Sequence, residues 1–259
     1  MGVVGKAKKL HRALTDATIP QRVVFHHVPK CGGTSVGRAL RRRYLLSQGT
    51  VTPESSFRAF EAFTGRADRE QMLVDVLDLR EQMFLYLLFE DVRCVSLHVR
   101  YSESAHNLFH GMYKFITILR EPVSRFISHY FWSYGKSHAH ARIEEPIEEF
   151  IQTERAKQLG ATYSEFFSGL PKLTDFASDD AVVAAISNLN KFDVVGTLDD
   201  LPAFAENVRS EIGIKIRIGH ENRSRRSLSE VKRVISPEVR QKIEELCEPD
   251  VRIWKSIRN

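Results

Sequence analysis

The spacing of apolar residues changes several times along the chain, between short β-rich runs and longer helical segments. Runs rich in valine, isoleucine and aromatic residues predict strands, whereas the segments between them have the spacing of amphipathic helices. Two runs, "RVVFHHV" and "YKFITIL", are apolar almost throughout, which is typical of strands buried on both faces of a parallel sheet. We expect strands at residues 22–28, 94–99, 113–119, 192–195 and 214–218.

Helices fill most of the intervals between these strands. Pro122 and Pro237 stand where a first helical turn accepts proline. The alternation of strands and helices predicts an α/β fold, a single domain with a parallel β-sheet flanked by helices. The expected helices are residues 34–46, 70–89 with room for a break, 122–134, 145–157, 179–188, 201–212 and 237–247, and the expected irregular insertions are residues 48–66 and 136–144.

The composition fits one globular domain with an anionic partner. The chain has 259 residues, of which 42% are hydrophobic, and this is enough to bury a sizeable core. We expect an N-terminal extension over residues 1–20 and one domain over residues 21–259. The formal net charge of +5 favours anionic ligands, but it is too small to indicate nucleic acid as a partner.

Cysteine usage and hydropathy bear on where the protein works. Cys31, Cys94 and Cys247 are odd in number and widely spaced, so they predict neither a disulfide framework nor a metal site. The longest apolar cluster, residues 83–89, is too short to span a membrane, and the first residues lack the apolar stretch of a signal peptide. We therefore expect a cytoplasmic protein; its oligomeric state is left open.

The segment "VVFHHVPKCGGTS", residues 23–35, has the composition of a phosphate-binding loop between a strand and a helix. Gly32 and Gly33 allow close approach of the backbone to an anion, and Thr34 and Ser35 add hydroxyl groups at the helix N-terminus. In a Walker loop the lysine immediately precedes the magnesium-binding hydroxyl residue, whereas Lys30 precedes both glycines. This spacing argues against an ATPase or kinase, and a plain strand-to-helix turn is the structural alternative.

A second segment, "YKFITILREPVSRFISHYFW", combines a strand, a proline-started helix and further anion-binding side chains. Arg120 follows the strand at its carboxyl end, the edge at which parallel sheets bind ligands, and Ser128 lies about two turns into the helix. The alternative is that Arg120 and Arg125 form surface salt bridges with carboxylates such as Glu121.

Together, "HVPKCGGTS" and "ITILREPVSRFISHYF" resemble the two nucleotide motifs of sulfotransferases that use 3′-phosphoadenosine-5′-phosphosulfate (PAPS). The resemblance is to the branch of Golgi carbohydrate sulfotransferases and their bacterial relatives. Further along, "KFDVVGTLDDL" resembles a late strand and turn of that family, and "ISPEVRQKIEELCEPDVRIWKSI" resembles its closing helices. The resemblance implies a P-loop-type parallel sheet, PAPS as the donor and 3′-phosphoadenosine-5′-phosphate (PAP) as the product.

The resemblance also assigns the anion-binding residues. It implies that Arg120 and Ser128 hold the 3′-phosphate, while the 5′-phosphosulfate is held by Lys30, Gly32, Gly33, Thr34 and Ser35. A sulfuryl group carries less charge than a transferred phosphoryl group, so lysine and backbone amides can suffice without a metal. Cys31, where the family commonly has threonine, is expected to fill space while its neighbouring amides bind; a reactive thiolate is the alternative.

Transfer to a hydroxyl group needs a residue that removes the acceptor's proton, and histidine has a suitable pKa. His98 matches the place of a family histidine just before the second motif, although Leu97 replaces the usual glycine. The alternative for His98 is a core histidine whose ring bonds to a carbonyl group, and Glu103 is then the reserve base. His27 is expected to support the glycine-containing loop.

A late basic segment offers one more contact. Arg223, with Arg225 and Arg226, follows the last expected strand, where relatives close over the nucleotide or acceptor; the alternative is a solvated basic loop. We therefore predict a PAPS-dependent sulfotransferase acting on an acceptor hydroxyl, by family analogy that of a carbohydrate such as a glycan or glycolipid. A nucleotide-binding or polyanion-binding module without catalysis is the competing hypothesis.

Overall fold

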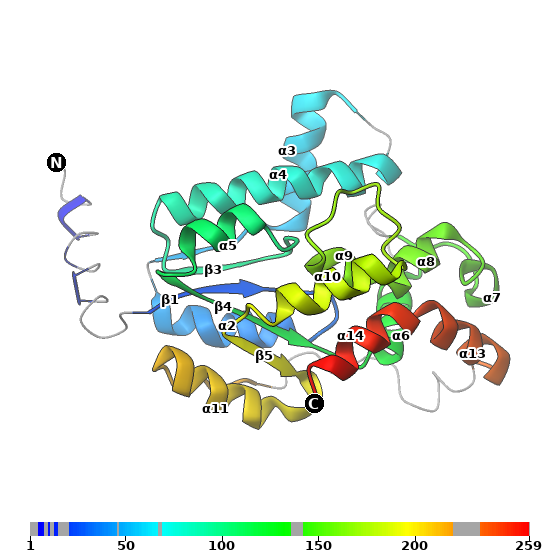
Figure 1. The fold of residues 1–259 in the computed structure, drawn as a ribbon. Helices are drawn as coiled ribbons and strands as arrows, with labels where there is room; N and C mark the ends of the chain where they lie inside the picture. The colour runs from blue at the N-terminus through cyan, green and yellow to red at the C-terminus, as the bar shows by residue number, and fades with distance from the viewer. Residues whose placement is uncertain are drawn as a thin grey trace.

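Five parallel strands form the centre of the molecule in the computed structural model (Figure 1). The structure describes residues 21–45, 47–66, 69–135, 142–219 and 234–258, together with residues 5–7, 10 and 13–14. The strands lie in the order β2-β3-β1-β4-β5. Their bounds are Arg22–His26 for β1, Gln48–Gly49 for β2, Cys94–Leu97 for β3, Tyr113–Leu119 for β4 and Val194–Thr197 for β5.

The position of β1 between β3 and β4 brings three loops to one edge of the sheet. His26 of β1 is in register with Leu97 of β3 and with Thr117 of β4. All three strands are parallel, so the segments that follow them leave the sheet at the same edge. This is the edge at which open α/β sheets bind their ligands.

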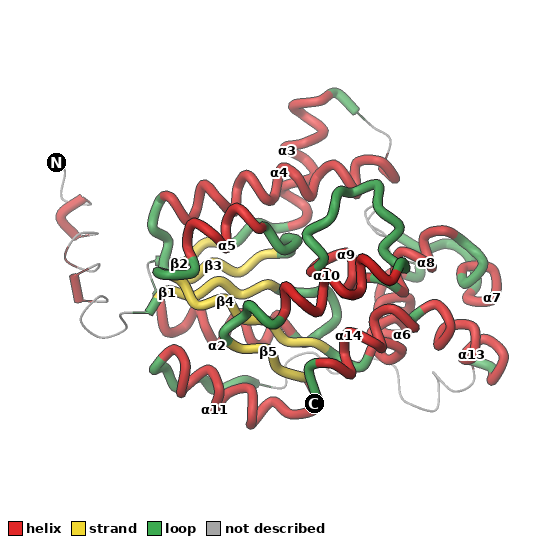
Figure 2. The backbone as a smooth tube through the Cα atoms, in the orientation of Figure 1, coloured by secondary structure: helices red, strands yellow, loops and turns green. Residues whose placement is uncertain are grey.

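Helices cover both faces of the sheet, as Figure 2 shows by the red segments on either side of the yellow strands. One face packs against α4 (Arg69–Phe89), α5 (Glu103–Phe109), α9 (Thr162–Phe167), α10 (Asp179–Leu189) and α14 (Glu248–Ser256). The other face packs against α2 (Gly33–Tyr44) and α11 (Leu201–Ile212). Within β1, Val24 points to the first cluster while Val23 and Phe25 point to the second, which explains why three successive residues of the strand are apolar.

A third apolar cluster lies beyond the carboxyl ends of the strands (Figure 1). It joins α6 (Pro122–Ser133), α7 (Ile147–Phe150), α8 (Glu154–Gly160) and α13 (Pro237–Leu246). The remaining elements are α3 (Pro53–Thr64), which packs against α4, and a short 3-10 helix, η1 (Leu198–Asp200). No helix in the described ranges is both long enough and apolar enough to pass through a bilayer.

The single α/β domain with a parallel sheet is confirmed, but one expected strand is wrong. Residues 214–218 form no strand in the described chain; they run as an irregular segment in which Ile214 and Ile216 are buried and Lys215 and Arg217 are exposed. The period of two that predicted a strand is therefore real, but its apolar residues pack onto the cluster around α2 and α11 without pairing to the sheet. A period of two in the sequence indicates which residues are buried, but a strand also needs a partner strand with which to form hydrogen bonds.

The helix boundaries need three corrections. The expected helix at residues 145–157 is two helices, α7 and α8, and Thr153 begins the second by accepting a hydrogen bond from the Ala156 amide. Residues 48–66 are not irregular, because they contain β2 and α3, whose first turn is capped by Thr52 and carries Pro53. Helix α4 has no break, and of the expected insertion at residues 136–144 only residues 142–144 lie within the described chain.

Candidate functional site

The loop between β1 and α2 turns sharply and presents a helix N-terminus. Lys30 has a φ of 67° and Gly32 a φ of 75°, so both lie in the left-handed region, which is uncommon for a lysine. The first turn of α2 carries no acidic residue. Because the first amides of a helix have no intrahelical acceptor, this loop directs N–H groups and partial positive charge toward the strand-end edge. An anion is the ligand that such a terminus favours.

His27 supports this loop, as the sequence predicts. A Cβ atom added at Gly33 would lie only 1.9 Å from Cδ2 of His27, so the imidazole occupies the space that any larger residue would need. Burial, then the nearby charges of His98 and Arg41, hold the pKa of His27 well below its usual value. A neutral His27 ring is therefore packed directly against the loop and helps to fix its shape.

His98 lies one residue beyond β3, beside the same loop. Its Nδ1 is 2.5 Å from the carbonyl oxygen of His27, and the two imidazole rings are 4.2 Å apart. A carbonyl oxygen only accepts hydrogen bonds, so Nδ1 carries the proton and Nε2 of the neutral ring is the basic nitrogen. This contact is the one expected of a structural histidine, but it also sets the tautomer that a general base requires, and His98 is only half-buried.

Arg120 and the α6 helix border the loop from the β4 side. Nη1 of Arg120 is 3.5 Å from the carbonyl oxygen of Lys30, at the limit for a hydrogen bond. Nζ of Lys30 lies 5.2 Å from the ring centroid of Trp132, over its face. Ser128 is one helical turn before Trp132 on α6, so these two residues share a helix face. The structure thus brings Lys30 and Arg120 together and places the face that carries Ser128 beside them.

The alternative of surface salt bridges for these arginines is wrong for Arg125. Glu121 caps α6 instead, because its two carboxylate oxygens accept hydrogen bonds from the amides of Val123 and Ser124. Arg125 is completely buried; one of its Nη atoms lies 3.5 Å from the carboxylate of Asp250 and also donates to a backbone carbonyl. The second arginine of the motif is therefore part of the interior.

A buried group of polar side chains joins this pair to the two loops. Asp250 accepts hydrogen bonds from the amides of Tyr163 and Ser164, at 2.8 and 3.2 Å, while burial raises the pKa of its carboxyl to about 7. The Tyr163 hydroxyl accepts a hydrogen bond from the Arg120 amide at 2.9 Å and donates to the Arg120 carbonyl at 2.5 Å. It also lies 3.4 Å from Sγ of Cys31. Tyr163 therefore connects the loop after β1 with the loop after β4.

Sequence reasoning did not find Tyr163 or Asp250. Neither residue stands in a motif, and each contacts residues far away in the chain. For Asp250, the available signal was an acidic residue beside Glu248 in the first turn of an amphipathic closing helix, which is an ordinary pattern.

Cys31 is buried, and its surroundings disfavour the reactive alternative. Its side chain is fully buried. Burial raises the pKa of the Cys31 thiol and outweighs the opposite influences of Arg125 and of the hydrogen bond to Tyr163. A thiolate at this position is therefore disfavoured, contrary to what the helix N-terminus and Lys30 alone suggest.

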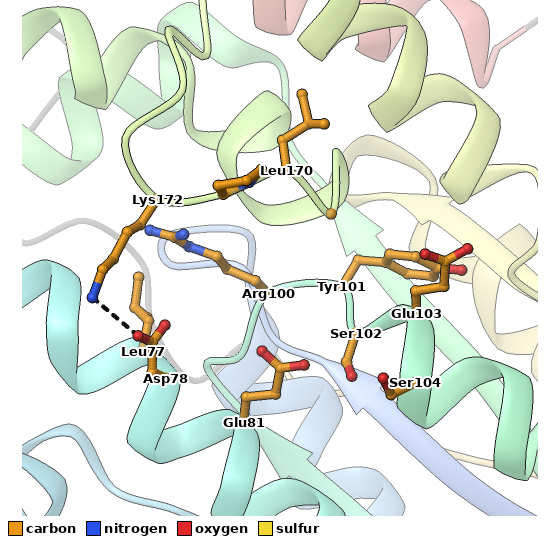
Figure 3. A pocket seen from close by; sticks show the side chains of 12 residues that line it. Leu77, Asp78, Glu81, Arg100, Tyr101, Ser102, Glu103, Ser104, Leu170 and Lys172 are labelled. Carbon is orange, nitrogen blue, oxygen red and sulfur yellow. Dashed lines mark hydrogen bonds and ion pairs between the residues drawn. The ribbon is translucent and has the colours of Figure 1, made fainter.

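A hollow of about 320 Å³ opens beside the segment that carries His98 (Figure 3). Arg100, only two residues after His98, lines it, so its Cα is at most about 7 Å away. Glu103, the reserve base, lines the same hollow as the first residue of α5. Lys172 closes one side through ion pairs with Asp75 and Asp78 on α4. Arg223, Arg225 and Arg226 lie outside the described residues.

Comparison with known proteins points to one family. A family model described as "Sulfotransferase family" matches residues 17–255 and so includes both loops of the site. Among solved structures, one that is similar is the crystal structure of a sulfotransferase from Alicyclobacillus acidocaldarius, with 16% sequence identity, a TM-score of 0.42, and coverage of 92% of this chain and 96% of that chain. No curated protein matches the chain.

Proposed function

Because the chain belongs to the sulfotransferase family, we propose that it transfers a sulfuryl group from PAPS to a hydroxyl group of a carbohydrate acceptor, such as a glycan or glycolipid. The observation that carries this proposal is the contact between the Arg120 guanidinium and the backbone carbonyl of Lys30, which places two cationic residues at a helix N-terminus on the strand-end edge. Such a site suits a ligand with two separate anionic groups, because the loop amides serve one group while Arg120 serves the other.

The residues present fit the donor. In this proposal Lys30 and the amides of Gly32, Gly33 and Thr34 hold the 5′-phosphosulfate, with the hydroxyls of Thr34 and Ser35 as further contacts. The amides of Cys31 and Ser35 already donate to backbone carbonyl groups. Arg120 and Ser128 hold the 3′-phosphate, and Arg223 is a further candidate contact. Bound PAPS supplies the sulfuryl group and a phosphate leaving group. Lys30 then stabilises the negative charge that develops on the leaving oxygen, which is greatest in the transition state.

His98 is the proposed general base. Its Nδ1 is held by the carbonyl oxygen of His27, so Nε2 is the nitrogen that accepts the proton of the acceptor hydroxyl. The hollow that begins within a few residues of His98 is the proposed entry for the acceptor. A sugar acceptor rests on the resemblance of the two motifs to those of carbohydrate sulfotransferases, since fold alone does not determine substrate.

Nucleotide selectivity tests the donor site. We expect wild type to bind PAP more tightly than AMP, which lacks the 3′-phosphate, and Arg120→Ala to lose much of that preference. One charge-assisted contact is worth about 1.5–3 kcal/mol, which corresponds to roughly one to two decades in affinity. Arg209→Ala is a matched control, because Arg209 is exposed and its one acidic partner among the described residues is Glu206 on α11. Undiminished discrimination in Arg120→Ala would show that Arg120 does not bind the 3′-phosphate.

Turnover tests the reaction itself. Labelled PAPS is incubated with a panel of glycans, glycolipids and phenols, and transfer is followed for wild type, Lys30→Ala and His98→Ala. We expect Lys30→Ala and His98→Ala to reduce the transfer rate more than PAP affinity. If the protein binds PAP but transfers sulfate to no acceptor, and His98→Ala binds PAP as wild type does, the protein is instead a nucleotide-binding module. An absence of PAP binding would refute both hypotheses.

A further inference from the structure

A second hollow, of about 370 Å³, lies at the carboxyl end of α2 and has a strongly basic lining. Apart from Ala39, every residue that lines it carries a positive charge: Arg42, Arg43, Lys215 and Arg217. We call these four residues and the space between them the basic hollow. Two of its cations come from the last turn of α2 and two from the irregular segment that follows α11.

The local structure directs all four side chains to solvent. Ile214 and Ile216 are buried in the cluster beneath α2, so the alternating residues Lys215 and Arg217 point the opposite way. Arg42 and Arg43 are likewise exposed on the last turn of the helix. The apolar packing that anchors the segment therefore also fixes two cations beside two others.

These cations have no carboxylate partner in the described chain. The cations of α13 differ in this respect, because Arg240 pairs with Glu244 and Lys242 with Glu245. The dipole of α2 favours cations in its last turn and accounts for the arginines of the helix. It does not account for Lys215 and Arg217, which belong to another segment and add like charge to the same space.

We propose that the basic hollow binds a compact ligand that carries two or more phosphate or sulfate groups. Each phosphate or sulfate group can accept hydrogen bonds from two neighbouring cations. A ligand that carries two or more such groups close together can therefore neutralise all four positive charges. The volume is in the range of small-ligand sites. The site is distinct from the donor loop, because Gly33 and Arg43 stand at opposite ends of α2, about 15 Å apart along its axis.

Calorimetric titration with tripolyphosphate tests the proposal. Four proteins are compared at low salt: wild type, Arg42→Gln/Arg217→Gln, the control Arg240→Gln/Lys242→Gln, and Lys30→Ala/Arg120→Ala, in which the donor loop is disabled. The first two double variants remove the same charge from exposed positions, but only one alters the basic hollow. We expect Arg42→Gln/Arg217→Gln to bind about tenfold more weakly than wild type, since two charge-assisted contacts are lost but both are screened by solvent.

The control Arg240→Gln/Lys242→Gln should retain the tripolyphosphate binding of wild type. Lys30→Ala/Arg120→Ala should lose only the share of binding that belongs to the donor loop and keep that of the basic hollow, and thermal unfolding should show that all four proteins are folded. A second series with a trisulfated disaccharide distinguishes sulfate esters from free phosphates as the preferred source of the anionic groups. Equal affinity of Arg42→Gln/Arg217→Gln and its control would overturn the proposal. So would an absence of binding by wild type, or a loss of all binding in Lys30→Ala/Arg120→Ala alone, which would place the anion at the donor loop only.

Discussion

Replacing Tyr163 with phenylalanine removes one oxygen atom from the point where the two loops of the site meet. The hydroxyl bonds to both the amide and the carbonyl group of Arg120 and lies against Cys31. Burial raises the pKa of Tyr163 well above its usual value, so the hydroxyl keeps its proton and remains a donor. Phenylalanine fills nearly the same space, so the substitution removes these contacts without opening a large cavity.

The structure sets the expected size of the effect. Without the hydroxyl, the backbone N–H and C=O groups of Arg120 lose a buried partner, and an unsatisfied buried group costs about 1–3 kcal/mol. We expect the free energy of unfolding to fall by about 1–3 kcal/mol, and the melting temperature of a domain of this size to fall by about 2–4 °C for each kcal/mol. Because Arg120 is then less firmly held beside Lys30, PAP affinity should fall about tenfold.

Tyr44→Phe is a matched control for Tyr163→Phe. Tyr44 is also fully buried, and its hydroxyl donates to the carbonyl oxygen of Gln21 at 2.9 Å. It stands at the opposite end of α2 from the loop, so its loss should destabilise the fold without altering the site. Denaturant unfolding and PAP titration are measured for wild type and both variants, at a temperature where each is fully folded.

The two measurements separate positioning from stability. We expect both variants to be destabilised, but only Tyr163→Phe to bind PAP more weakly, with Tyr44→Phe within about twofold of wild type. If both variants bind PAP as wild type does, or if both lose affinity in proportion to their stability, then Tyr163 has no specific role in positioning Arg120.

Three further predictions follow from buried groups. Asp250→Ala should lower the free energy of unfolding by about 3–5 kcal/mol, because it leaves a buried guanidinium group without its carboxylate partner. Asp179→Ala, which removes an exposed ion pair, should lower it by less than about 1 kcal/mol. Equal losses of unfolding free energy in the two variants, measured by urea titration, would contradict this prediction. Burial lowers the pKa of His26 to about 4, so between pH 6.5 and 4 the unfolded chain binds a proton that the native chain does not, and stability should fall on acidification by about 1.4 kcal/mol per pH unit. His26→Phe should reduce the slope by about this amount when unfolding is compared at pH 7 and 5, and the share of His27, whose pKa is also lowered, should remain. An unchanged slope would refute the assignment. Gly33→Ala should lower PAP affinity by about tenfold or more, because the new Cβ would lie 1.9 Å from the ring of His27; a variant with normal affinity would show that the loop shape is not needed.

The sequence alone predicted those features that depend on neighbouring residues. The apolar run at residues 113–119 predicted β4 with its observed bounds, since a strand buried on both faces has few polar interruptions. The glycines and Lys30 likewise stand together in the chain, so their shared loop was predictable. Proline at a first helical turn correctly indicated the starts of α6 and α13.

Tertiary structure alone decided the features that depend on distant residues. Tyr163 contacts Arg120 across 43 positions and Asp250 contacts Arg125 across 125, and no local pattern encodes such a pairing. Residues 214–218 have the periodicity of a strand, but a strand forms only where the segment can pair with another strand, and that partner belongs to a distant part of the chain. This segment packs its isoleucines against the cluster around α2 and α11 and does not pair with a strand. That packing places Lys215 and Arg217 beside the last turn of α2 and so forms the basic hollow.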